Sequence, residues 1–564
     1  MPALLRFPLA CVAACTAMLM STFGPFAAWA AESDVIAVVA IDPYADIRNQ
    51  LTWVGEQVGN PTLAGFAESF ILLATQGKGL AGLDVKRPVG IVVTSNGGPL
   101  PTAHAFVPVK DLAKLLGAIQ GLTGPIEEDG DVRRIAPPGG MPLEITEKNG
   151  WAVLSQPGEP IDLDDPTTLI GPLSETHTLA VELFPSRMPA ELRNRLNELL
   201  EEAARNAAER GQPMDDATLR AGVDSLEHVE KLVVGFAVDV AKETMRVDVT
   251  STLTPEAGAA LKWPKVAGTI ASPDTANGKP AAMRGHYVAA IPKDGEAAMR
   301  TAIDQVLSAA DDTPRDQAIA GLLRDMIAAM LQTGTIDAGF TIDTSAASEE
   351  SPLPAITIGM KVKDGAALQS KIKERLSKPG VLPEDVAVAF DTGKEGDATL
   401  HEITIDTSKS PATERLGDHV KVTLAVTPDY AYLMAGGDVK KRLATTLAAA
   451  GKPVPDATPF FGVDTSLAAL VDYAARMTKI FTPENPQSEA LDVVAAQAAE
   501  KESTAIRLSA TPIERGFTFQ LSIDGGALQT VAGSSSVSVN VQPNSRPMAP
   551  IRPMPRQNIP SLAP

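Results

Sequence analysis

Cysteine is scarce in this sequence of 564 residues. The chain has two cysteines, Cys11 and Cys15, and both lie in its first thirty residues. That region also holds Arg6, an uncharged segment over residues 7–31, and the Ala-x-Ala pattern of a signal-peptidase site at Ala28-Trp29-Ala30. We therefore predict a signal peptide over residues 1–30 and export of the protein to the periplasm, the cell envelope or the medium. The mature chain would lack cysteine, which excludes disulfides, thiolate metal sites and a cysteine nucleophile.

Two other fates of the N-terminal segment stay open in the sequence. Its uncharged stretch is long enough to span a bilayer if it is not cleaved. Val12-Ala13-Ala14-Cys15 resembles a bacterial lipobox, although the further apolar run over residues 17–31 argues against lipidation. No other segment approaches the about 18 apolar residues of a membrane helix, so we expect no span after signal removal.

Aromatic residues and positive charge are also sparse. Aromatics make up 4% of the chain, so small aliphatic side chains must fill the cores, and platforms for stacking bases or sugar rings are few. The chain has 49 Lys and Arg against 69 Asp and Glu, which gives a formal net charge of −20. Nucleic-acid binding needs a basic surface that displaces counterions. We therefore expect no nucleic-acid partner, and an acidic surface that keeps the protein soluble.

One sequence pattern occurs twice. Pro99-Leu100-Pro101 is followed after a short strand-like stretch by Lys110-Asp111, and Pro352-Leu353-Pro354 is followed in the same way by Lys363-Asp364. In both copies a helical pattern follows, and we expect the aspartate to cap it. An upstream strand pattern recurs at nearly the same offset. These echoes predict a duplicated module of about 250 residues, a size within the range of single domains.

The periodicities predict hairpins that alternate with helices. The clearest is the hairpin that turns at Asn149-Gly150, a pair that a type I′ turn favours. We predict an α+β fold of two tandem homologous modules, each a mainly antiparallel sheet covered by helices. Residues 378–406 have no clear counterpart in the first copy and are expected to be an insertion. The predicted segments are a signal peptide (1–30), a first module (31–263), a linker (264–281), a second module (282–532) and a disordered Ser/Pro-rich tail (533–564).

No motif assigns chemistry to the chain. Residues 77–82 fit the Gly-x-Gly-x-x-Gly pattern, but a helix and not a strand precedes them, so we predict a helix end and a turn. The acidic stretches 127–131 and 162–165 could offer oxygen ligands to calcium, and we interpret them as turns. The histidines occur singly, without the spacing of a helical metal pair: His104, His177, His228, His286, His401 and His419. The catalytic residues are thus unknown, and we predict no cofactor and no metal.

Residues 79–84, 87–90 and 147–152 resemble stretches of large exported bacterial proteins of no assigned activity. The resemblance implies no functional residue. The leading hypothesis is an exported, non-enzymatic envelope protein that binds or scaffolds an envelope polymer or a protein through its duplicated module. One alternative is a solute-binding protein that closes on a small ligand between two lobes. Another is a hydrolase whose site lies between the lobes and is not visible in the sequence.

Overall fold

The computed structural model describes most of the chain between residues 34 and 540. The residues between these limits that it does not describe are 96–100, 137–140, 159–162, 164, most of 196–225, 261–280, most of 292–313, 348–351, 409–412, 453–457 and 483–486. The predicted signal peptide, nearly all of the predicted linker and the last residues of the predicted tail therefore lie outside the described part.

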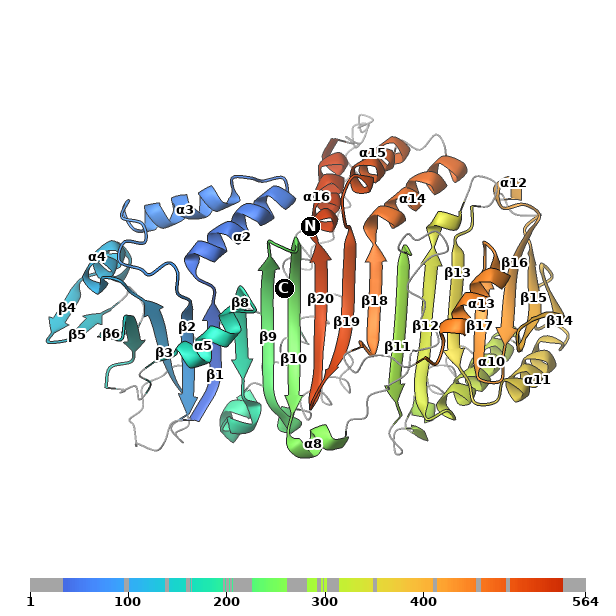
Figure 1. Ribbon diagram of the computed structural model, residues 1–564, viewed down its shortest axis with the longest axis horizontal. Helices are drawn as coiled ribbons and strands as arrows, with labels where there is room; N and C mark the ends of the chain where they lie inside the picture. Colours follow the sequence, from blue (N-terminus) through green and yellow to red (C-terminus); the bar gives the residue numbers. More distant parts are fainter. Residues whose placement is uncertain are drawn as a thin grey trace, which may run out of the picture.

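A single antiparallel sheet of 20 strands runs through the described part of the molecule (Figure 1). The strands of the first half are β1 (Asp34–Ile41), β2 (Val89–Ser95), β3 (Thr102–Pro108), β4 (Ile126–Asp129), β5 (Val132–Ile135), β6 (Leu143–Lys148), β7 (Trp151–Ser155), β8 (Leu179–Leu183), β9 (Val229–Asp239) and β10 (Thr244–Leu253). Those of the second half are β11 (Met283–Ala290), β12 (Thr335–Asp343), β13 (Ala355–Lys361), β14 (Val386–Glu395), β15 (Ala398–Asp406), β16 (His419–Val426), β17 (Tyr430–Ala435), β18 (Phe461–Ser466), β19 (Ala505–Ile513) and β20 (Gly516–Asp524).

The strand order is the same in both halves. In the first it is β4-β5-β6-β7-β3-β2-β1-β8-β9-β10, and adding ten to each label gives the order of the second. The halves join where β10 pairs with β20, from Thr244 opposite Asp524 to Thr252 opposite Gly516. Corresponding strands thus meet at the centre of one continuous ladder.

The predicted fold class is therefore wrong. The sequence indicated two tandem modules, each with its own sheet covered by helices, whereas the molecule has one sheet that dominates the fold. Periodicity shows which residues form a strand but not which strand lies at its edge. The edges of β10 and β20 would each expose unpaired backbone groups in a separate module, and pairing them removes both edges.

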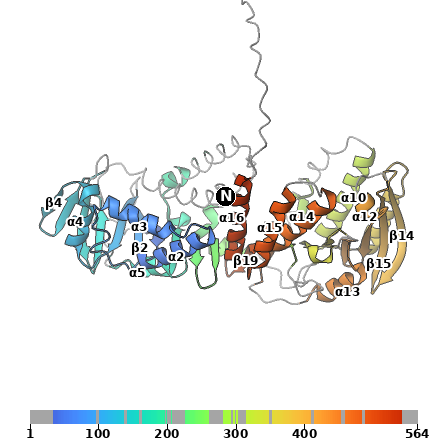
Figure 2. The same ribbon diagram turned by 90° about the horizontal axis from the view of Figure 1, so that it is seen from above.

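Helices lie along one end of the strands and on both faces of the sheet. The described α-helices are α2 (Tyr44–Gln57), α3 (Leu63–Ala74), α4 (Leu112–Thr123), α5 (Thr167–Ser174), α8 (Pro255–Ala260), α10 (Pro314–Leu331), α11 (Gly365–Leu376), α12 (Thr413–Leu416), α13 (Val439–Ala449), α14 (Leu467–Phe481), α15 (Gln487–Ala499) and α16 (Gly525–Asn540). Seen from above, α3, α2, α16, α15 and α14 form one row that crosses the junction of the halves (Figure 2).

Alternation along the strands assigns each core to one face of the sheet. In β16, Ala425 packs with Leu443 of α13, whereas its neighbours Leu424 and Val426 pack with α10 and α11. Successive side chains of a strand point to opposite faces. Helices α13 and α11 therefore cover opposite faces. Ile170 of α5 packs over Gly90, and the strand pairings place Gly90 in register with Ala425, so α5 covers the same face as α13.

Several local predictions are confirmed. Asn149 and Gly150 have φ of 53° and 74° and connect β6 to β7. Asp111 Oδ1 accepts a hydrogen bond of 3.0 Å from the Lys114 amide, and Asp364 Oδ1 accepts one of 2.9 Å from Ala367, so both aspartates cap helices. Residues 77–82 form a turn after α3 with three glycines at positive φ.

Two other local predictions differ from the structure. Residues 378–406 are not an insertion, because they contain β14 and β15, which hold the places in the second half that β4 and β5 hold in the first. Helix α16 continues to Asn540, so residues 533–540 are helical and not part of an extended tail.

Candidate functional site

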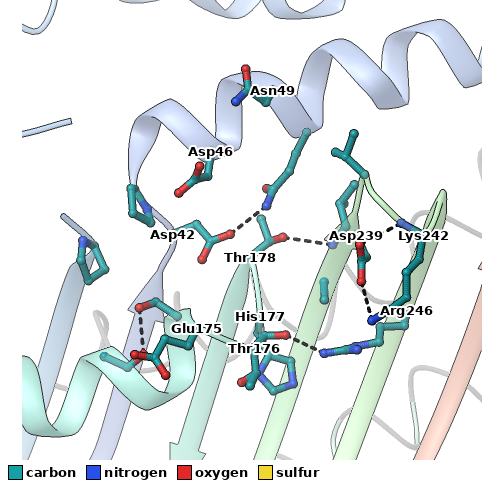
Figure 3. Close-up of a pocket in the computed structure, with 18 of the residues that line it drawn as sticks. Asp42, Asp46, Asn49, Glu175, Thr176, His177, Thr178, Asp239, Lys242 and Arg246 are labelled. Atoms are coloured by element: carbon teal, nitrogen blue, oxygen red, sulfur yellow. Dashed lines mark hydrogen bonds and ion pairs between the residues drawn. The ribbon is translucent and has the colours of Figure 1, made fainter. Parts of the chain in front are cut away.

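A polar cleft with a volume of about 1060 Å³ opens in the first half of the sheet. It lies between the first turns of α2, the last turn of α5, and the ends of β8, β9 and β10 (Figure 3). Its polar lining includes Asp42, Asp46, Asn49, Glu175, Thr176, His177, Thr178, Asp239, Lys242 and Arg246.

The local sequence places Asp42 at the base of this cleft. Asp42 directly follows β1, and Pro43 then starts α2, because proline fits a position where no backbone N–H is needed. The Asp42 amide donates to the Thr178 carbonyl at 2.9 Å, which fixes the end of β1 against β8. Two turns along α2, Gln50 turns back so that its Nε2 donates to Asp42 Oδ2 at 2.8 Å.

Asp42 is a buried acid. Its exposed fraction is 7%, and burial raises its pKa from 3.8 to about 6, while the hydrogen bond from Gln50 opposes the shift and the nearby charge of Asp46 adds to it. Asp42 Oδ1 and Gln50 Oε1 are buried and have no hydrogen-bond partner within the described structure. The cleft wall therefore holds two acceptors without a donor, a costly arrangement in a folded protein.

His177 lines the cleft and lies against the face of the sheet. A Cβ atom added at Gly235 would overlap its ring, so the imidazole lies directly on the β9 backbone. His177 Nδ1 lies 2.8 Å from Thr176 Oγ1, and Nε2 lies 3.3 Å from Asp248 Oδ2. Burial raises the pKa of Asp248, but hydrogen bonds from His177 and Gln520 and the charge of Arg246 together hold it below its ordinary value.

Both cations of the cleft are already paired. Arg246 Nε lies 2.8 Å from Asp248 Oδ2, and its Nη2 donates to the Thr176 carbonyl at 2.7 Å. Lys242 Nζ lies 2.9 Å from Asp239 Oδ2, and this contact lowers the pKa of Asp239. Asp42, Asp46 and Glu175 form no ion pair with any described residue. The cleft thus presents acids whose charge no cation neutralises.

The second half does not reproduce this chemistry. Where His177 and Thr178 precede β8, Pro459 and Phe460 precede β18. Where Asp42 follows β1, Ile291 follows β11. The two halves share a strand order, but only the first half has the polar residues of this cleft. The site therefore does not lie between the halves.

The sequence did not identify these residues as a site. Among its residues, only His177 is named in the sequence analysis, as one of six histidines without a metal-ligand spacing. Of the six histidines only His177 lines this cleft, whereas His104 in β3 and His401 in β15 are buried elsewhere in the sheet. An acidic residue between a buried β-branched strand and a helix was the one available signal. Asp248, the partner of His177, is distant in the sequence, and its neighbouring residues give no signal of a site.

The acidic stretches are accounted for locally where they are described. Asp129 pairs with Arg134 across the β4–β5 hairpin, and Asp165 Oδ1 accepts a hydrogen bond of 2.9 Å from the amide of Thr167 at the start of α5. Asp162 and Asp164 lie outside the described residues. In the described part of the chain, no three His, Cys, Asp or Glu side chains gather closely enough to hold a metal ion. No described helix is both long and apolar enough to cross a bilayer.

Comparisons with protein-family models, with curated proteins and with solved structures found no match to this chain. Function must therefore be inferred from the cleft itself.

Proposed function

We propose that this protein is an exported, non-enzymatic binding protein of the cell envelope, and that its cleft takes up a small polar solute. Asp42 is the observation that carries this proposal. It is an acid more than nine-tenths buried, with a raised pKa and an oxygen that lacks a donor, in the wall of a large cleft. A buried carboxyl group without full hydrogen bonding destabilises the fold. Groups of this kind cluster at functional sites.

Binding fits the geometry better than catalysis does. Thr176, His177 and Asp248 line up as a hydroxyl, an imidazole and a carboxylate, which is the order found in hydrolases. However, Thr176 Oγ1 also lies 3.2 Å from the carbonyl oxygens of both Pro172 and Leu173. Its hydroxyl can therefore donate its proton to α5 and not to His177. Asp248 is shared with Arg246 and Gln520. A hydrolase that uses Thr176 is the second candidate.

Export is supported by the N-terminal sequence. The uncharged segment, the Ala-x-Ala site and a mature chain free of cysteine are typical of an exported protein without disulfides. A mass spectrum of the mature protein should show Ala31 as its first residue. A chain that begins at Met1 or at a lipidated Cys15 would contradict signal-peptide cleavage.

A pair of matched variants tests the binding role. Ser174 lines the cleft from α5 and donates to the carbonyl of Gly171, and Ser69 makes the same kind of contact to Gly65 on α3. Ser174→Trp should fill the cleft, whereas Ser69→Trp should leave it open. Each variant and the wild type are screened by thermal shift against cationic, neutral and anionic four-carbon solutes at millimolar concentration.

We expect at least one class of solute to raise the melting temperature of the wild type and of Ser69→Trp, but not of Ser174→Trp. An equal response of all three proteins, or no response of the wild type to any class, would refute the proposal. Hydrolysis of ester or amide probes that is lost in Thr176→Val would favour the second candidate.

A further inference from the structure

The contacts around Asp42 point to the class of ligand, and this inference rests on the proposed binding function. We infer that the cleft binds a small organic cation, whose primary ammonium group pairs with the carboxylate of Asp42 and brings donors to a wall that lacks them. Gln50 Nε2 donates to Asp42 Oδ2 at 2.8 Å, so Asp42 Oδ1 and Gln50 Oε1 take no part in this hydrogen bond. Both are acceptors, and both lack a donor within the described structure.

The number of donors decides between ligand classes. An ammonium group has three N–H donors and no acceptor, so it adds donors alone to this wall of the cleft. A hydroxyl has a single donor and would leave one of the two oxygens unsatisfied. A carboxylate or phosphate has acceptors alone, and would add a third acceptor to a site that already lacks donors.

The charges of the lining favour the same class. The cleft is lined by four carboxylates, on Asp42, Asp46, Glu175 and Asp239, against the two cations Lys242 and Arg246. Both cations lie within 3 Å of a carboxylate of the protein, at 2.9 Å and 2.8 Å. An anionic ligand would have to break these pairs, whereas a cation meets acids that are not neutralised.

Burial makes the charge of the ligand matter. A carboxylate at the base of a cleft is poorly solvated, and a cation beside it restores the interaction that water has lost. At a pH near the raised pKa of Asp42, a bound ammonium would displace the proton of this acid. The other titratable groups on this side of the cleft are Asp46 on α2, His177 before β8, and Glu175 after α5.

The experiment compares three probes with the same four-carbon chain. They are 1,4-diaminobutane, 1,4-butanediol and succinate, titrated calorimetrically into the full chain at low salt and pH 7.5. The wild type should bind the diamine at least tenfold more tightly than the diol or succinate. At pH 6, diamine binding should also release protons, measured in buffers of different ionisation enthalpy.

Three variants test the assigned atoms. Asp42→Asn should weaken diamine binding at least tenfold, and Gln50→Glu, which places a second carboxylate at the same position, should strengthen it several-fold. A gain in affinity cannot arise from misfolding. Asp472→Asn on α14 removes one negative charge from an exposed site far from the cleft, and should change diamine affinity less than twofold.

The outcomes separate the two proposals. Preference for the diol or succinate, blocked by Ser174→Trp, would refute the ammonium class and leave the binding function in place. Diamine binding that survives Asp42→Asn and is not strengthened by Gln50→Glu would also refute it. Failure of all three probes to bind the wild type would overturn both proposals.

Discussion

The imidazole of His177 rests on Gly235, the β9 residue that pairs with Asp248 across the ladder. A methyl group at position 235 would overlap the ring. The glycine therefore allows His177 to reach Asp248, at 3.3 Å between Nε2 and Oδ2. Backbone in one strand thus decides the side-chain geometry of the cleft.

This contact predicts the effect of Gly235→Ala. The added methyl should displace His177 from Asp248 and destabilise the protein by about 1–3 kcal/mol, the usual range for overpacking. Urea denaturation measures the change. The control is Gly117→Ala in α4, where nothing lies within 4 Å of an added Cβ. This control should stabilise by about 0.5–1 kcal/mol, because alanine is favoured over glycine inside a helix. Equal effects at both positions would contradict the assigned role of Gly235.

Asp42→Asn should stabilise the protein at neutral pH. The folded-state pKa of Asp42, about 6, lies above its ordinary value of 3.8, so the folded protein binds more protons than the unfolded chain in between. The contribution of protonated Asp42 to the free energy of unfolding is fully present below pH 3.8 and is lost as pH rises through 6. The variant should therefore gain on the wild type between pH 4 and 7, by about 1–3 kcal/mol at pH 7.5.

Melting curves at several pH values measure this gain, with Asp325→Asn as the control of opposite sign. Asp325 is partly buried beside Arg375 and Lys371, at 2.5 Å and 3.2 Å, and their hydrogen bonds and charges outweigh desolvation and lower its pKa. This variant should lose stability at neutral pH. A stability gain for Asp42→Asn that is the same at pH 4 and pH 7.5 would rule out the buried-acid explanation.

His104 should make the fold sensitive to acid. It is 3% exposed in β3, its Nδ1 has no hydrogen-bond partner in the described part of the protein, and burial lowers its pKa from 6.5 to about 4. The unfolded chain therefore takes up the proton first, and stability falls as pH drops from 6.5 towards 4. The loss should reach about 1–3 kcal/mol.

The variant His104→Leu should flatten the decline of stability between pH 6.5 and 4 in urea titrations. His419→Leu, at an exposed position in β16, should keep the slope of the wild type. An unchanged slope in His104→Leu would assign the acid sensitivity to other groups.

The continuous sheet predicts a single unfolding transition. The three tryptophans beyond the predicted signal peptide, Trp53, Trp151 and Trp263, all precede the second half in the sequence, whereas far-UV circular dichroism reports both halves. Trp53 packs with Leu528 of α16, and Gln529 Nε2 donates to Gln57 Oε1 at 2.7 Å, so the halves also share a helical contact. Fluorescence and dichroism curves in urea should coincide. Curves with separate midpoints would show that the halves unfold independently.

The sequence predicted local structure well where the cause is local. Turn chemistry at Asn149-Gly150 and capping by Asp111 and Asp364 depend on a few neighbouring residues, and they are confirmed. The architecture was predicted wrongly because the pairing of β10 with β20 joins residues about 270 positions apart in the chain, beyond any periodicity.

The cleft was missed for a related reason. Asp42, His177 and Asp248 come from three separate elements, and nothing in their local sequence shows that they converge. The buried state of Asp42, which marks it as unusual, depends on how α2 and β8 close over it. Cysteine and charge content could exclude classes of function, but they could not locate a site.

The pairing of β10 with β20 also determines when the sheet of the first half can be completed. Strand β20 is the last strand of the described residues, and the outer edge of β10 stays unpaired until residues 516–524 have been made. During synthesis, the first half would carry an open strand edge while about 270 further residues are made. Open edges recruit other chains, and such distant pairing forms slowly. Strand β20 therefore covers the open edge of the first half. A truncated protein that lacks β20 would expose this edge and be prone to aggregate.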